Sequence, residues 1–360
     1  MTSIPKEPEE VMKRRGGSVL GKKTILKSDH FPGCHNKRLH PHIDGAPNYR
    51  QAESLLVHGV AIPTTDGIRN VLKHIGARAE GKKAQVLWIN LREEPVVYIN
   101  GRPFVLRDVE RPFSNLEYTG INRERVEQME ARLKEDILME AARYENKILV
   151  TDELPDGQMV DQWESVSCNS VKTPLEVYQE LQVAGYLVDY ERVPITDEKS
   201  PKEWDFDILV HKISQADVNT EIIFNCQMGR GRTTTGMVIA TLFYLNRIGA
   251  SEQLTISLAS CKKLYLQKYS SLGFFCRTGL AGVVASAVSD GGVAGGRTGV
   301  DPLLIHVILW CCQFSFTAQH SGHEPPKALL RSWSMEWSHK PIPSLSLLLH
   351  IINRFSIFLN

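Results

Sequence analysis

A cysteine followed six residues later by an arginine is the pair of side chains in this chain most suited to chemistry. The two residues are Cys226 and Arg232, in the segment Cys-Gln-Met-Gly-Arg-Gly-Arg. The apolar run before them, residues 221–225, predicts a short buried strand, and residues 233–246 have the apolar spacing of a helix. The spacing therefore places the pair on a loop that joins a strand to a helix N-terminus.

Such a loop is suited to binding a phosphate group. Gly229 and Gly231 allow successive backbone N–H groups to face one anion, and the helix dipole adds positive charge at the same point. Arg232 can donate two N–H bonds to phosphate oxygens, and the same field stabilises a thiolate at Cys226. The segment predicts covalent phosphoryl transfer with Cys226 as the nucleophile. A buried structural cysteine before a glycine-rich turn is the alternative interpretation.

Four further segments accompany the loop: Gly45-Ala-Pro-Asn-Tyr-Arg50, Asn90-Leu-Arg-Glu-Glu-Pro95, Tyr98-Ile-Asn-Gly-Arg-Pro-Phe104 and Thr196-Asp197. With them, the chain resembles the cysteine-dependent phosphatases, the superfamily of protein tyrosine, dual-specificity and lipid phosphatases. Within it, residues 45–250 resemble the phytase-like branch and specifically paladin-type proteins. Paladin-type proteins usually repeat this unit along a longer chain, and we find one unit here.

Phosphoryl transfer to a thiolate also needs an acid to protonate the leaving oxygen. The resemblance implies that an aspartate on a loop some thirty residues before the cysteine supplies this proton. Asp197, which lies 29 residues before Cys226, fits this place. Glu198 and Asp205 are alternative acids, and a turn-forming or helix-capping aspartate is the structural alternative.

The resemblance also implies the residues that contact the substrate. The loop positions are Gln227, Met228, Gly229, Arg230, Gly231 and Thr233, and Arg50 adds a cation by likeness to phytase-like enzymes. A second loop cation, Arg230, resembles phosphatases of inositol phosphates and phosphoinositides, whose several phosphates need several cations. Alternatively, Arg230 faces solvent or pairs with an acidic neighbour. Thr233 is expected to hydrogen-bond the thiolate.

Some residues depart from the family pattern or have no clear role. Asn225 stands where many members have a histidine, and Gln227 and Met228 replace residues that often carry charge. These departures leave room for a weak enzyme or a binding-only relative. For the segment 90–94, two interpretations have equal weight. It either lies at the rim of the substrate site or braces the loop, or it is a solvated charged turn. His58, Lys73 and His74 are expected at the surface.

Composition limits the partners. The chain has 360 residues, 42% hydrophobic content and a net charge of +1, so bulk charge does not predict nucleic-acid binding. Seven cysteines without a regular framework, and no secretory signal, predict a reducing cytoplasmic location. We expect no metal and no cofactor. The expected partner is a phosphorylated small molecule, a lipid headgroup or a phosphoprotein, with membrane association only through a lipid substrate or an apolar tail.

The chain divides into three parts by composition. Residues 1–44 are expected to form a flexible N-terminal arm, since residues 1–27 are charged and poor in apolar side chains. Residues 45–250 form the phosphatase-like domain. Residues 251–360 are poor in charge and rich in Gly, Ser and Ala, which predicts a divergent, poorly ordered tail. The apolar runs in this tail are too short or too interrupted to span a membrane well.

The domain itself reads as mixed α/β. Strands are predicted at 86–90, 96–100, 147–150, 186–190 and 221–225, and helices at 123–144, from Thr173, at 204–214 and at 233–246. Asn100-Gly101 is a hairpin signal. The resemblance implies a cysteine-phosphatase fold with a central mixed or mainly parallel sheet, helices on both faces, and the anion loop between a strand and a helix.

Two classes of function follow. The first is a metal-independent phosphomonoester hydrolase that works through a phosphocysteine, with Cys226, Arg232 and Asp197 as its catalytic residues. Its substrate is an inositol phosphate or phosphoinositide, with phosphotyrosine as a further class. The second is a pseudophosphatase, whose pocket binds phosphorylated ligands or partners with weak turnover or none.

Overall fold

The computed structural model describes residues 8–29, 41–52, 55–78, 84–197, 199 and 201–247. The chain divides into two compact units, residues 1–51 with 56–237 and residues 52–55 with 238–360. The first unit contains the secondary structure described below, and the second contributes the C-terminal part of the last helix. The predictions for residues 251–360 lie outside the described residues.

A five-stranded sheet carries the candidate site. In spatial order its strands are β10 (Val188–Ile195), β4 (Val86–Arg92), β11 (Glu221–Asn225), β3 (Val57–Val60) and β2 (Arg50–Gln51). The first four strands are parallel, and β2 pairs antiparallel with β3. Asn225 aligns with both Asn90 and Val60, so the carboxyl ends of β4, β11 and β3 meet at one edge. Ligand loops of parallel sheets lie at this edge.

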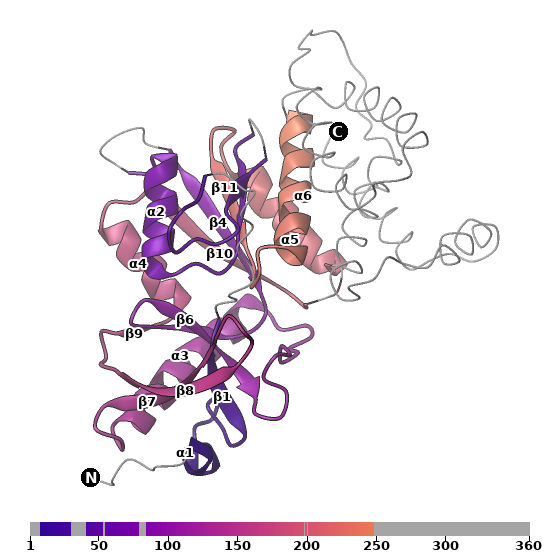
Figure 1. The fold of residues 1–360 in the computed structure, drawn as a ribbon. Helices are drawn as coiled ribbons and strands as arrows, with labels where there is room; N and C mark the ends of the chain where they lie inside the picture. Colours follow the sequence, from indigo (N-terminus) through magenta and orange to yellow (C-terminus); the bar gives the residue numbers. More distant parts are fainter. Residues whose placement is uncertain are drawn as a thin grey trace, which may run out of the picture. The chain divides into compact units, whose positions relative to one another are not determined.

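Helices cover both faces of this sheet (Figure 1). On one face, α2 (Thr65–Ile75) and α4 (Pro174–Val183) bury apolar side chains against Trp88 and Ile223. On the opposite side lie α5 (Glu203–Gln215) and the start of α6 (Gly231–Arg247). A Cβ added at Gly236 of α6 would lie 2.5 Å from the ring of Phe224, so this helix packs directly on β11. The predicted mainly parallel sheet with helices on both faces is confirmed.

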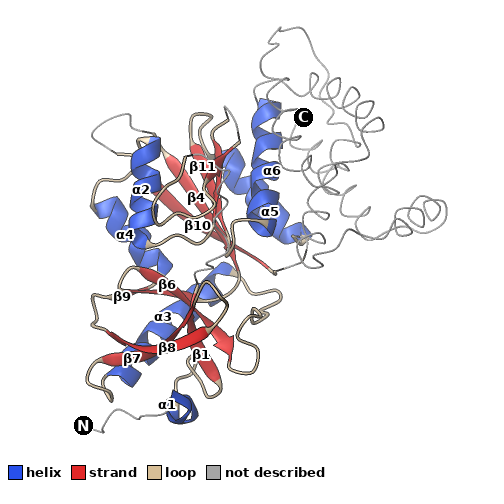
Figure 2. Ribbon diagram, in the orientation of Figure 1, coloured by secondary structure: helices blue, strands red, loops and turns tan. Residues whose placement is uncertain are grey.

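A second, mostly antiparallel sheet lies apart from the first (Figure 2). We call it the inserted sheet because five of its strands, β5 to β9, lie between β4 and β10 in the sequence, while β1 joins it from the N-terminal segment. Its strands, in spatial order, are β8 (Met159–Ser165), β7 (Lys147–Glu153), β1 (Thr24–Ser28), β6 (Arg102–Asp108), β5 (Val96–Ile99) and β9 (Val171–Lys172). The amphipathic helix α3 (Arg123–Ala141) packs Leu133 and Ile137 against this sheet. The sequence predicted several of these strands but not that they form a separate sheet.

Local sequence signals explain several boundaries. Asn100 and Gly101 adopt φ values of 50° and 80°, which is the left-handed geometry that a tight hairpin between β5 and β6 requires. Thr173 caps α4 through a capping box with Glu176, and Pro174 occupies the first turn. The first signal therefore defines the hairpin between β5 and β6, and the second defines where α4 begins after β9.

The expected flexible arm is wrong for residues 8–29. These residues form α1 (Pro8–Arg14) and β1, and β1 lies between β6 and β7 within the inserted sheet. Arg15 is buried beside Glu140 and also donates hydrogen bonds to the carbonyls of Thr24 and Leu149. The charged composition was misleading because Arg15 and Lys27 are partnered inside the fold, although other charges such as Lys13 and Lys23 are exposed.

Candidate active site

The anion loop, Cys226 to Arg230, joins β11 to α6 as the sequence predicts. Its carbonyls face the protein: Ile62 N–H donates to the Gln227 carbonyl at 3.0 Å, and the Asn48 amide donates to the carbonyls of Met228 and Gly229, each at 3.0 Å. Within the described residues, the backbone N–H groups from Gln227 to Arg232 have no acceptor. A row of unpartnered N–H groups at a helix N-terminus favours an anion.

Gly229 is required for this loop shape. Its φ is +67°, and an added Cβ would lie 2.5 Å from the Ala61 nitrogen. Any side chain here would therefore strain the backbone and push the loop away from β3. The glycine identified in the sequence thus has a specific steric role.

The thiol of Cys226 lies at the base of the loop and is only 3% exposed. The Thr233 hydroxyl donates a hydrogen bond to the sulfur at 3.0 Å, as the sequence predicts. A hydroxyl in this position stabilises a thiolate both before attack and when it is released.

Arg232 is buried and its guanidinium is fixed along one edge. Its Nη1 lies 3.2 Å and 3.1 Å from the two carboxylate oxygens of Glu94 and donates to the Ile195 carbonyl at 3.1 Å. Its Nε lies 3.3 Å from Asp197 Oδ1, an ion-pair contact without hydrogen-bond geometry. Because Glu94 contacts only Nη1, it leaves the Nε–Nη2 edge of the guanidinium available. This edge is a fork that can donate to two phosphate oxygens.

The Glu94–Arg232 pair sets the charge at this point. Burial alone would raise the pKa of Glu94, but Arg232 and Arg92 lower it to about 2. Burial alone would lower the pKa of Arg232, but Glu94, Asp197 and Cys226 raise it. Both side chains are therefore ionised throughout the neutral pH range. A charged Arg232 is what phosphate binding requires.

The structure brings Asp197 to the same site, where it follows Thr196 after the end of β10. Its side chain is 35% exposed, with Oδ1 facing Arg232 and Oδ2 accepting a hydrogen bond from the Asn115 amide. Of the alternative acids, Asp205 accepts the Lys202 backbone N–H at the start of α5, where burial raises its pKa. Glu198 lies outside the described residues. The geometry therefore favours Asp197 over Asp205 as the group nearest the anion loop.

The segment 90–94 makes bracing contacts. Glu94 holds Arg232, and Glu93 accepts the Thr196 hydroxyl at 2.9 Å beside the candidate acid. Burial raises the pKa of Glu93, although its hydrogen bonds oppose this shift. Asn90 accepts a hydrogen bond from Asn225 at 3.3 Å. Of the readings that the sequence left open, the contacts support the brace.

Asn225, which replaces the family histidine, belongs to this buried network. Besides donating to Asn90, it accepts the Trp88 indole N–H at 2.9 Å. Its polar atoms are therefore satisfied by β4, and its side chain helps fix the end of β11.

The remaining predicted contacts are divided. Arg50 donates to the Asn48 carbonyl and, at 3.0 Å, to the Thr234 hydroxyl, so it lies next to the loop. Arg230 is partly exposed, and its side chain makes no hydrogen bond or ion pair within the described residues. Gln227 is buried and is used inside the protein, where it donates to Asp29 at 3.0 Å and accepts from Asn115 at 3.0 Å. Gln227 therefore supports the loop rather than presenting a free side chain to a ligand.

Several supporting residues were missed by the sequence analysis. Asp29, Arg107 and Asn115 lie around the site, although no motif marks them. Asn48 lies within the resembling segment 45–50 but had no predicted role. Asp29 and Arg107 come from the inserted sheet and Asn115 from the loop after β6, so tertiary pairing alone reveals them.

His58 is a further correction. It is buried, not at the surface, and lies 2.9 Å from the Tyr49 hydroxyl and 2.8 Å from Glu221 Oε2. Both partners are buried, so this polar set is satisfied within the core. Lys73 and His74 are exposed, as predicted.

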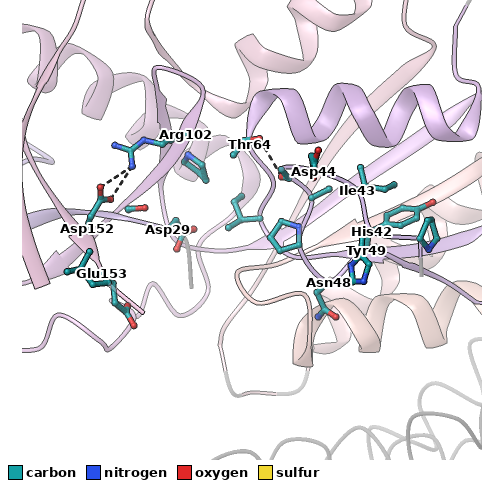
Figure 3. A pocket seen from close by; sticks show the side chains of 18 residues that line it. Asp29, His42, Ile43, Asp44, Asn48, Tyr49, Thr64, Arg102, Asp152 and Glu153 are labelled. Carbon is teal, nitrogen blue, oxygen red and sulfur yellow. Dashed lines mark hydrogen bonds and ion pairs between the residues drawn. The ribbon is translucent and has the colours of Figure 1, made fainter. Parts of the chain in front are cut away.

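A cavity of about 510 Å³ lies beside two supports of the anion loop, Asp29 and Asn48 (Figure 3). Arg102, on another part of its lining, forms an ion pair with Asp152 at 3.0 Å. None of the described residues that line it belongs to the segment 226–232. The candidate anion site at the loop N–H groups is therefore separate from the lining of this cavity.

Comparison with known proteins agrees with this site. A family model described as PTP-like phytase, inositol hexakisphosphate, matches residues 89–244, which include the second half of β4, Asp197 and the anion loop. Residues 89–244 are therefore similar to PTP-like phytase domains. The resemblance to the phytase-like branch of cysteine-dependent phosphatases is thereby confirmed.

The curated relatives that this chain matches carry the name paladin. The chain is 30% identical to chicken (Gallus gallus) paladin over 221 residues, which is 60% of this chain and 24% of paladin. It is 28% identical to human (Homo sapiens) paladin over 251 residues, which is 65% of this chain and 29% of paladin. The chain thus spans about a quarter of the length of the paladins that it matches, and the resemblance to paladin-type proteins is confirmed.

Solved PTP-like phytases are also similar to this chain. A PTP-like phytase from Bdellovibrio bacteriovorus is 18% identical, with a TM-score of 0.42, and the match covers 82% of this chain and 89% of that one. The myo-inositol phosphatase from Mitsuokella multacida, in complex with myo-inositol-(1,3,4,5)-tetrakisphosphate, is 15% identical with a TM-score of 0.46. That match covers 86% of this chain and 49% of the Mitsuokella chain.

Two other kinds of feature are absent from the described residues. They hold no helix with the length and apolarity needed to cross a bilayer. They also hold no group of three or more His, Cys, Asp or Glu side chains placed to bind a metal ion.

Proposed function

We propose that this protein hydrolyses phosphomonoesters through a phosphocysteine intermediate. One observation carries the proposal: the Cys226 sulfur, the unpartnered N–H groups of its loop, the Nε–Nη2 edge of Arg232 and the Asp197 carboxyl belong to one site. These groups supply the nucleophile, the N–H donors that bind the phosphate oxygens, and the acid that such a reaction needs.

In the first step, the Cys226 thiolate attacks phosphorus and the bond from phosphorus to the ester oxygen breaks. The loop N–H groups and Arg232 hold the three equatorial oxygens, whose charge is shared in the transition state. Asp197, in its protonated form, gives its proton to the leaving oxygen, so an alcohol is released.

In the second step, water attacks the phosphocysteine and the S–P bond breaks. Asp197, now a carboxylate, takes a proton from this water as inorganic phosphate forms. The Thr233 hydroxyl, 3.0 Å from the sulfur, stabilises the departing thiolate. The enzyme returns to its starting state once Asp197 holds a proton again.

For the substrate, we propose an inositol phosphate or the headgroup of a phosphoinositide. The matching family is described by inositol hexakisphosphate. Arg230 supports the proposal because its cation is partly exposed within the anion loop and has no side-chain partner among the described residues. A second cation suits a ligand with several phosphates. Phosphotyrosine is the further class to be tested, since it needs a single phosphate site.

A pseudophosphatase remains the second candidate function. It is favoured by Asn225 in place of the family histidine, because the donors of Asn225 face Asn90 in the core. Such a protein would bind phosphorylated ligands in the same loop without turnover. A cytoplasmic location, where thiols stay reduced, would suit either function.

A substrate panel with a matched variant tests the proposal. The full chain is offered inositol hexakisphosphate, a soluble phosphoinositide and a phosphotyrosine peptide, and phosphate release is measured beside Cys226→Ser. We expect release by the wild type on the inositol substrates and a loss of about 10⁵-fold or more in the variant. Binding by both proteins without release from any substrate would establish the pseudophosphatase instead.

A further inference from the structure

Asn115 is the side chain that connects the candidate acid to the anion loop. It lies in the loop between β6 and α3, and its Nδ2 donates to Asp197 Oδ2 and, at 3.0 Å, to Gln227 Oε1. Its Oδ1 accepts a hydrogen bond from the Arg107 guanidinium. An amide NH₂ has two hydrogens, and here each has its own acceptor.

The chemistry of the partners fixes the direction of each bond. An arginine can only donate, so the Asn115 oxygen must face Arg107, and its NH₂ must then face Asp197. Gln227 is oriented in the same way, because its NH₂ donates to a carboxylate oxygen of Asp29 at 3.0 Å. Its carbonyl oxygen is thereby left to accept from Asn115. Neither amide can be reversed without setting like groups against each other.

This chain of bonds ends in the protein interior. Asp29 stands directly after β1, is 1% exposed, and forms an ion pair with Arg92. Burial lowers the pKa of Arg107 to about 10, and nearby carboxylates oppose the shift, so Arg107 remains a cation at neutral pH. Asn115 is therefore held by buried charged groups, while its acceptor, the Asp197 carboxyl, is partly exposed. A donor that is fixed in the interior can position an acceptor that lies nearer the surface.

Resting on the proposed function, we infer that Asn115 is a positioning residue that selects which oxygen of Asp197 carries the catalytic proton. With Oδ2 occupied by Asn115, Oδ1 is the oxygen that faces the Arg232 Nε, at 3.3 Å. Arg232 is the group that clamps the transferred phosphoryl. Oδ1 is thus directed toward the leaving oxygen, and Asn115 prevents the carboxyl from turning away.

The same two loops also offer a matched control. Lys199 and Glu117 form an ion pair at 3.1 Å, but their side chains are 51% and 66% exposed. Exposed pairs of this kind contribute little to stability. Lys199→Ala therefore removes a contact between the loops without touching the bonds of Asn115.

The test compares Asn115→Asp, Asn115→Ala and Lys199→Ala in the full chain by two independent measurements. Asn115→Asp keeps an oxygen for Arg107 but removes both donors and sets a carboxylate against Asp197. Asn115→Ala removes the donors without adding charge. Hydrogen exchange of a peptide spanning Thr196 and Asp197 reports loop position, and hydrolysis of inositol hexakisphosphate and p-nitrophenyl phosphate reports proton delivery.

We expect both Asn115 variants to speed hydrogen exchange of the peptide that spans Thr196 and Asp197 by about tenfold or more. Lys199→Ala should leave this exchange near the wild-type rate. On inositol hexakisphosphate, kcat should fall by about 10²-fold with KM nearly unchanged, because a misplaced acid affects the transition state. On p-nitrophenyl phosphate, whose leaving group needs little protonation, kcat should fall less than about threefold.

Three results overturn the inference: unchanged exchange in both Asn115 variants, equal acceleration in Lys199→Ala, or equal losses of kcat on the two substrates. Failure of the proposed function is distinguishable from these. If the wild type hydrolyses neither substrate, phosphoryl transfer is refuted, and faster exchange in the Asn115 variants alone still establishes that Asn115 holds the acid loop.

Discussion

The two halves of the candidate site are built in different ways. The nucleophile half lies in the core of the parallel sheet: Cys226, Asn225 and Thr233 are all nearly or fully buried, and β3 and β4 support them. The acid half is one partly exposed carboxyl, Asp197, held at the end of β10 by Asn115 and Arg232. The candidate nucleophile is therefore positioned by the fold itself, and the candidate acid by a few polar contacts.

This difference predicts that mutations on the acid side change rate more than stability. Asp197→Asn should lower kcat on inositol hexakisphosphate by about 10²–10⁴-fold, because the amide cannot protonate the leaving oxygen. The loss on p-nitrophenyl phosphate should be smaller, and the midpoint of urea unfolding should move little. Steady-state kinetics and urea titrations measure both. Equal losses on the two substrates would assign the acid role to another residue, with Glu198 the next to mutate.

Mutations on the nucleophile side should act on stability as well. Glu94→Gln leaves the buried cations Arg232 and Arg92 without their shared carboxylate, which should cost about 3 kcal/mol in free energy of unfolding. Its neighbour is the matched control: Glu93→Gln removes a carboxylate that burial disfavours and keeps an acceptor for Thr196, so we expect a change within about 1 kcal/mol. Urea denaturation compares them, and similar costs would contradict the distinction.

A smaller effect of the same two carboxyls should be visible as a pH dependence. The pKa of Glu94 is lowered from its ordinary 4.5 to about 2, so its stabilising contribution is complete above pH 4.5 and is lost as the pH falls toward 2. Burial raises the pKa of Glu93, so this group contributes to stability at low pH. That contribution is lost as the pH rises through the pKa of Glu93 in the folded protein. The stability gap between wild type and Glu94→Gln should therefore narrow on acidification. A gap constant from pH 6 to 2.5 would refute this assignment.

The smallest expected effect concerns alkylation of the thiol. Cys168 is a free and exposed cysteine, so it provides an internal reference for Cys226. At each cysteine, the measured quantity is the alkylation rate with anionic iodoacetate divided by the rate with neutral iodoacetamide. This ratio should be about tenfold higher at Cys226 than at Cys168, because the loop attracts anions. Inorganic phosphate should slow this reaction at Cys226 alone. Peptide mass spectrometry after timed alkylation gives both rates, and identical preferences at the two cysteines would argue against an anion site.

Residues that act within one contiguous segment were predictable from the sequence. The spacing from Cys226 to Arg232, with the glycine at 229, determines a strand–loop–helix unit, and the periodicity of α3 was clear for the same local reason. Asn115 and Asp29 could not be found in this way, because the contacts that place them at the site, with Asp197 and Gln227, join positions far apart in the sequence. His58 looked like a surface residue because sequence alone does not show that Tyr49 and Glu221 satisfy both of its ring nitrogens.

The insertion between β4 and β10 has a consequence for how the molecule folds. Val188 pairs with Val86 in adjacent parallel strands, although about a hundred residues separate them in the sequence. Closing so long a loop costs conformational entropy before any pairing repays it, and compaction of the inserted sheet shortens the span. The strand that delivers Asp197 should therefore dock late in folding, after the inserted sheet has formed. A folding intermediate at that stage would already contain the anion loop at the end of β11, whereas Asp197 would not yet be in place.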